Sequence, residues 1–175
     1  AAAGAVVAGT GGTPAQAAGG STLKFKDVPH GNDETHHVAE GYRADVLIRW
    51  GDPLMKDSPE FVPGKVDAAA QEKQFGYNND FIAFMPLPYG SRSSTHGLLG
   101  VNHEYTNAEL MFPGITTERG SGTKGLTREQ VDHEMSGFGL SVVEVRKVKG
   151  AWRYVKDSSY NRRFTMRTTP FRIAG

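Results

Sequence analysis

Two short polar segments carry side chains that suit a metal ion. Asn78, Asn79 and Asp80 stand directly before an apolar run, and Glu104 lies at the polar end of the next one. Amide and carboxylate oxygens are the ligands that hard cations such as calcium prefer. If both segments open on the same rim of a sheet, Asn79 or Asp80 could meet Glu104 in one oxygen-rich pocket. A structural interpretation competes, because Asn-Asn-Asp is also a common turn sequence and a strand-end glutamate is often solvated.

A second candidate site is the arginine pair Arg162 and Arg163, which follows Asn161. Forked guanidinium groups bind phosphate through paired hydrogen bonds, so the two arginines are candidates for substrate binding. The alternative is that they are ordinary surface cations. The G-x-S-x-G elbow and the Walker loop, which are typical of common hydrolases and nucleotide-binding proteins, do not occur in the sequence.

The overall composition narrows the class of protein. The chain has 20 lysines and arginines against 19 acidic residues, a formal charge of +1, whereas nucleic-acid binders normally have a strong basic excess. We therefore expect no nucleic-acid partner, and an anionic substrate would need a local cluster of arginines or metal ions. The chain has no cysteine, which excludes disulfides, thiolate metal sites and cysteine nucleophiles within it.

Residues 1–20 are rich in alanine and glycine and have two interpretations. They could be a flexible tail, or the remnant of a secretory signal peptide whose A-x-A cleavage motif is Ala15-Gln16-Ala17. We favour the signal peptide and expect a periplasmic or secreted protein. The apolar run is too short and weak to predict a membrane span.

The elements that must position these residues are mainly strands. A capping box at Thr127 and Gln130 predicts one convincing helix ending near Gly137 or Gly139, and 68–73 could form a helical turn. Apolar and β-branched runs predict strands over 45–50, 81–87, 98–105, 140–148, 152–155 and 162–173. The pattern predicts an all-β fold with long loops, either a propeller or a sandwich.

Several segments, in order, make the chain resemble the PhoX family of bacterial alkaline phosphatases over about residues 40–175. They are Phe75-Gly76-Tyr77-Asn78-Asn79-Asp80-Phe81, His96-Gly97-Leu98-Leu99-Gly100-Val101-Asn102-His103-Glu104-Tyr105-Thr106, Glu109-Leu110-Met111-Phe112-Pro113-Gly114, Leu140-Ser141-Val142-Val143-Glu144-Val145, Trp152 and Ser159-Tyr160-Asn161-Arg162-Arg163. The alanine-rich start also resembles the end of the twin-arginine export signals common in that family.

The resemblance implies a β-propeller that hydrolyses phosphate monoesters with a cluster of iron and calcium ions near its axis. It implies metal binding by Asn79 and Glu104, with Asn78 and Asp80 as weaker candidates. No particular ion can be assigned to a particular side chain. Such metals would bind phosphate oxygens and stabilise the charge that develops during hydrolysis.

Two departures from the family pattern limit what the resemblance implies. Members have a further stretch with a cysteine and two glutamates that this chain lacks, and they often have His-Gly where this chain has Phe138-Gly139. A propeller needs several four-stranded blades, so 21–175 would be only the N-terminal part of one, which we expect to be inactive alone. The rest would come from the same chain or a second chain. The alternative is a non-catalytic propeller-like binding or structural module.

Overall fold

The computed structural model describes residues 26–116 and 125–174, and the chain forms two compact units, 1–45 and 46–175. The described part of the first unit, 26–45, contains no helix or strand. The signal peptide or tail expected at 1–20 lies outside the described residues. Of the helices in the described ranges, none combines the length and the apolar character needed to cross a bilayer.

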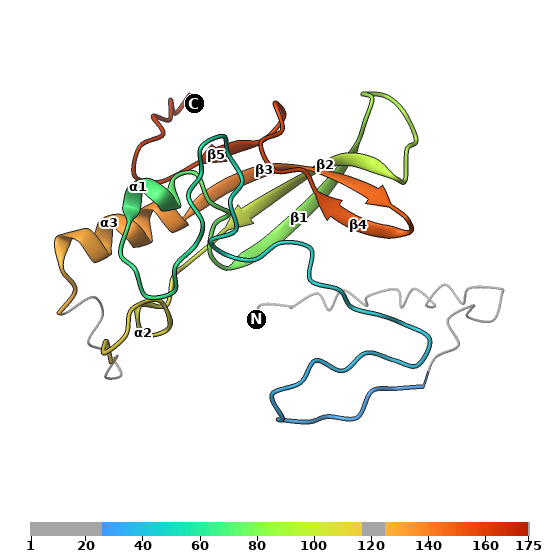
Figure 1. The fold of residues 1–175 in the computed structure, drawn as a ribbon, viewed down its shortest axis with the longest axis horizontal. Helices are drawn as coiled ribbons and strands as arrows, with labels where there is room; N and C mark the ends of the chain where they lie inside the picture. Colours follow the sequence, from blue (N-terminus) through green and yellow to red (C-terminus); the bar gives the residue numbers. More distant parts are fainter. Residues whose placement is uncertain (1–25, 117–124, 175) are drawn as a thin grey trace, which may run out of the picture. The chain divides into compact units, whose positions relative to one another are not determined.

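The second unit contains one antiparallel sheet of five strands (Figure 1). They are β1 (Asn79–Pro86), β2 (His96–His103), β3 (Gly139–Val148), β4 (Ala151–Tyr154) and β5 (Arg162–Phe164). Neighbours follow the order β1-β2-β3-β4, while β5 pairs with the first residues of β3. The expectation of a mainly β protein is confirmed, but a propeller is not, because the described residues form a single open sheet whereas a propeller has several around a common axis.

The hairpins form where the sequence predicts them. β3 and β4 are joined by Lys149 and Gly150, whose positive φ values of 50° and 82° are those of a tight two-residue turn. β3 itself is rich in valine, a β-branched residue that fits a pleated and partly buried surface. β1 and β2 form the predicted longer hairpin.

Within the described residues three short helices accompany the sheet: α1 (Ala68–Gln71), α2 (Ala108–Met111) and α3 (Arg128–Gly137). The predicted capping box is present, since the Gln130 amide donates to the Thr127 hydroxyl (3.2 Å) and the Thr127 amide donates to the Gln130 side chain (2.8 Å). The helical turn expected within 68–73 is α1. α2 was not predicted, and its four residues make only one turn.

The core lies on one face of the sheet. Val101, Val143 and Val145 point from β2 and β3 toward Leu54 and Phe75, which come from the irregular chain before β1. All five are at most 2% exposed. The core thus fixes the entrance to β1 against the middle of the sheet.

The strand predicted over 45–50 is wrong. These residues have no ladder partner; Leu47 and Ile48 instead pack against the core from a loop. The loop is held by side chains, because the Arg49 amide donates to Asp52 and the Trp50 indole donates to Gln71. The strand expected over 162–173 is too long, since only Arg162–Phe164 pair with β3.

Candidate functional site

The two polar segments singled out from the sequence lie side by side. Asn79, the first residue of β1, is the register partner of His103, the last residue of β2. One residue further out, the Glu104 amide donates to the Asn78 carbonyl oxygen over 3.1 Å. The expectation that both segments open on one rim of the sheet therefore agrees with the geometry.

The oxygen-bearing side chains of this rim are not used by the rest of the described structure. Asn79, Asp80 and Glu104 are exposed, and their side chains make no hydrogen bond or ion pair to the described residues. Asn78 adopts φ 43°, a left-handed conformation that asparagine tolerates better than most residues. In Asn102, the side-chain oxygen is buried without a partner in the described structure. The rim thus offers several oxygen donors to a ligand.

The oxygen atoms of the rim fit the coordination shell of a metal ion only in part. Carboxylate and amide oxygens match calcium, which takes six to eight oxygen ligands. Within 26–116 and 125–174, however, no three histidine, cysteine or acidic side chains gather closely enough to hold an ion. The rim can therefore supply part of a calcium shell and not a complete metal centre.

A buried histidine, His103, holds the backbone of the rim in place. His103 donates from Nδ1 to the Tyr77 carbonyl (3.2 Å), so its Nε2 accepts from the Ser141 hydroxyl (2.7 Å). Burial, assisted by the positive charge of Arg163, lowers the pKa of His103 to about 3, and the ring is neutral at physiological pH. His103 fixes the backbone just before Asn78. The alternation of the strand places it on the face opposite Glu104, which could have signalled this internal role.

Gly76 makes this arrangement possible. A side-chain Cβ at this position would lie 2.4 Å from the His103 ring and 2.6 Å from the Gly137 carbonyl oxygen. The Tyr77 amide donates to that same carbonyl over 3.1 Å. Only glycine allows the chain to pass so close to both groups before it enters β1.

The arginine pair has two different environments. Arg163 is partly buried, and its guanidinium donates to the carbonyl oxygens of Ser136 (2.7 Å) and Leu140 (3.2 Å). Burial lowers the pKa of Arg163 to about 10, partly opposed by the negative charge of Glu72. Arg162 is exposed and donates to the Ser159 carbonyl oxygen. Arg163 therefore holds the end of α3 against the sheet, and phosphate binding by either arginine stays a prediction.

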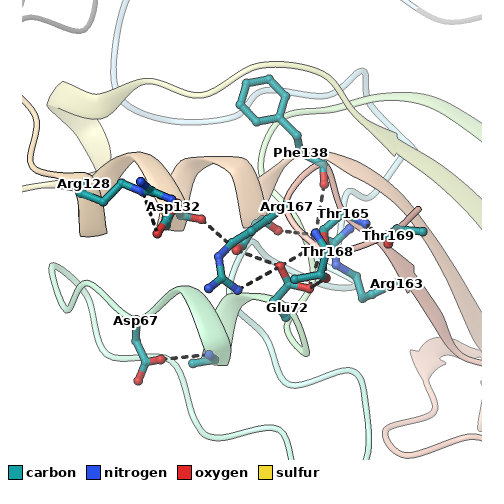
Figure 2. A network of polar contacts seen from close by, with 12 residues as sticks. Asp67, Glu72, Arg128, Asp132, Phe138, Arg163, Thr165, Arg167, Thr168 and Thr169 are labelled. Atoms are coloured by element: carbon teal, nitrogen blue, oxygen red, sulfur yellow. Dashed lines mark hydrogen bonds and ion pairs between the residues drawn. The ribbon is translucent and has the colours of Figure 1, made fainter. Parts of the chain in front are cut away.

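A network around Glu72 was not predicted from the sequence. Glu72 follows α1 and accepts hydrogen bonds from the hydroxyl groups of Ser136, Thr165 and Thr168, while Arg167 lies 3.7 Å away (Figure 2). The network ties the chain after β5 to the two helices. The cluster of threonines in 165–169 was the feature of the sequence that could have indicated this network. Their partner, Glu72, lies too far away in the sequence for the contact to be predicted.

A buried carboxylate, Glu144, lies near the middle of β3. It accepts hydrogen bonds from Ser158, His96 and Arg146. Burial alone would raise the pKa of Glu144, but these three donors outweigh it, and the pKa lies below its usual range. This ion cluster is structural, because its carboxylate is fully occupied by protein donors.

Comparison with known proteins gives the same family by two routes. The family model described as "Alkaline phosphatase PhoX" matches residues 23–175. Among solved structures, the chain matches Pseudomonas fluorescens PhoX in complex with vanadate, a transition state analogue, with 37% identity and a TM-score of 0.68. The match covers 81% of this chain and 23% of the solved one. No curated protein matches the chain. Because the family model covers most of the sequence, the chain belongs to the PhoX family of alkaline phosphatases.

Proposed function

We propose that this chain is the N-terminal part of an exported, metal-dependent phosphatase that hydrolyses phosphate monoesters. The observation that carries the proposal is the match to the PhoX family over residues 23–175, with 37% identity to a PhoX that binds vanadate. Vanadate adopts the five-coordinate geometry of a phosphoryl group under attack, so a protein that binds it as a transition state analogue is built for phosphoryl transfer.

In this proposal the rim between β1 and β2 contributes to the metal centre. Asn79 and Glu104 provide oxygen ligands to calcium, with Asn78 and Asp80 as weaker contributors. Bound metal ions supply charge stabilisation at the phosphate oxygens and orient the attacking oxygen. His103 acts as a positioning residue, because it holds the backbone from which Asn78 and Asn79 project.

The proposal also includes the rest of the enzyme. The chain spans 23% of the length of the solved PhoX, and a propeller needs several blades. We therefore propose that the remaining propeller is supplied by the same polypeptide or by a second chain, and that this piece is inactive alone. Arg162 is the better placed of the two arginines to meet a phosphate, since its side chain is exposed whereas Arg163 is partly buried and donates to backbone carbonyls.

Export to the periplasm or the exterior by the twin-arginine route is part of the same proposal. It is supported by the family and by the alanine-rich residues 1–20 with their A-x-A motif. Fractionation of cells producing the natural protein, followed by N-terminal sequencing, tests it. Mature protein in the periplasm that starts after Ala17 is the expected result, and intact protein in the cytosol would contradict it.

A non-catalytic, propeller-like module is the competing function. It is favoured by the absence of a complete set of acidic, histidine or cysteine metal ligands in the described residues. The two functions differ in what Glu104 does. In the phosphatase it binds metal and is needed for turnover, and in the module it is dispensable.

The decisive experiment inserts this chain into Pseudomonas fluorescens PhoX in place of its matched part. The fusion is assayed with a phosphate monoester in calcium and iron, and its metal content is measured by mass spectrometry. We expect turnover, with Glu104→Gln lowering it by at least about 100-fold and removing bound calcium, because a charged ligand is lost. Glu109→Gln, an exposed control on α2, should change neither. Full activity and calcium content in Glu104→Gln would refute the metal role.

A further inference from the structure

The β1 strand exposes an unusual amount of apolar surface for an element of a sheet. Phe81 is 66% exposed, Ile82 57%, Met85 43% and Phe84 40%. These four residues lie within five consecutive positions of β1. β1 is at one edge of the sheet (Figure 1). Isolated exposed apolar residues are normal, but a contiguous group of this size marks a surface that contacts another macromolecule.

The exposed residues lie on both faces of the sheet. Ile82 and Phe84 are the partners of Val101 and Leu99, which point toward the core, so they extend the core face beyond its cover. Met85 is the partner of Leu98 and therefore lies on the opposite face. Its methyl group would contact a Cβ at Gly100 at 3.5 Å, which places it over that glycine. β1 is thus apolar on both sides.

The β4 side of the sheet is mixed. Its exposed charged residues are Arg146, Lys147 and Arg153, beside the exposed apolar residues Val148 and Trp152. The Trp152 ring lies edge-on to Phe84 of β1, with 5.7 Å between the ring centroids. Alternation of apolar and polar residues is typical of a strand with one wet face, whereas an apolar strand on both faces is typical of a sheet covered on both sides. Charged residues keep part of the β4 side in water, whereas β1 has the apolar pattern of a strand that is covered on both faces.

We propose that both faces of β1 are docking surfaces for the remainder of a PhoX-type polypeptide, which lays one apolar sheet surface on each face. The length of the solved PhoX identifies the partner that covers β1. The match includes 81% of this chain but only 23% of the solved PhoX, so most of that polypeptide has no counterpart here. The proposal rests on the incomplete enzyme of the preceding section, but not on its chemistry. A second copy of this chain is the competing occupant.

The absence of cysteine provides a direct test. Single cysteines are introduced as Ile82→Cys on the core face, Met85→Cys on the other face and Leu110→Cys on α2, whose side chain is 72% exposed. A maleimide labels each protein as the free chain and as the fusion with the unmatched remainder of Pseudomonas fluorescens PhoX. Mass spectrometry of peptides reads the rate at each position, and analytical ultracentrifugation reads the mass of the free chain.

We expect labelling at Ile82→Cys and Met85→Cys to be at least about 10-fold slower in the folded fusion, because a covered thiol cannot be attacked. Leu110→Cys should change by less than about twofold. Equal labelling of the β1 cysteines in both proteins overturns the proposal, as does equal protection at Leu110→Cys. Protection already present in a dimeric free chain assigns the surface to a second copy and also overturns it. Since labelling does not depend on turnover, a covered β1 in an inactive fusion would refute the phosphatase and leave the docking surface standing.

Discussion

Replacing His103 by glutamine should remove a defined part of the dependence of stability on pH. The buried ring has a pKa of about 3 in the folded protein, against 6.5 when it is unfolded. Between these values the unfolded chain binds a proton that the folded chain does not. The free energy of unfolding therefore falls as the pH drops below 6.5, and the contribution is fully present only above that value.

The size of the effect follows from the two pKa values. At pH 5 the unfolded imidazole is almost fully protonated, which costs the folded state about 2 kcal/mol relative to pH 7. Other titrating groups, such as His133 with its burial-lowered pKa, add their own dependence, but they remain in the variant and cancel in the comparison. His103→Gln should thus be less stable at pH 7 but lose about 2 kcal/mol less than the natural chain on going to pH 5.

Urea unfolding followed by circular dichroism at pH 7 and pH 5 measures both quantities. His30→Gln, at an exposed position in the first unit, is the matched control and should leave the pH dependence unchanged. If His103→Gln and the natural chain lose the same free energy between the two pH values, His103 is not a buried neutral residue and the account of the rim's support fails.

Two further predictions concern the supports of the rim and of β3. Gly76→Ala should lower the free energy of unfolding by about 2 kcal/mol or more, because the added methyl group overlaps the His103 ring and a backbone oxygen. Gly100→Ala is the control, since a Cβ at Gly100 meets only the flexible end of Met85. Thermal unfolding compares the two variants, and equal stability would contradict the close contact at Gly76. Asn161→Ala should lower the free energy of unfolding by about 3 kcal/mol, because the side chain accepts from the Glu144 amide and donates to the backbone carbonyls of Leu54 and Val155. Chemical denaturation measures this loss, and a loss below about 1 kcal/mol would show that water replaces the side chain.

Short sequence motifs correctly predicted the structural elements that depend only on residues close together in the sequence. The capping box at Thr127 and the turn at Lys149 are decided within four residues, so both follow from local chemistry. The adjacency of Asn79 and Glu104 was also predictable, because an antiparallel hairpin returns its second strand to the start of its first.

Contacts made at long range were not predictable in this way. The run 45–50 has the composition of a strand, but Trp50 donates to Gln71 and the segment covers the core as a loop. The burial of Arg163 depends on carbonyl groups at the end of α3, which paired arginines in a sequence do not reveal. Tertiary context decided both cases.

The Glu72 network has a consequence for the order of assembly. Glu72 meets Thr165 across 93 residues of sequence, and this contact joins the region of α1 to the segment that follows the last strand. During synthesis from the N-terminus, Glu72 is made long before Thr165 and Thr168. Its carboxylate is therefore solvated by water while the hairpins between them form. Because contacts between distant residues close late, the helical side of this unit can be locked only after residues up to Thr168 have been synthesised.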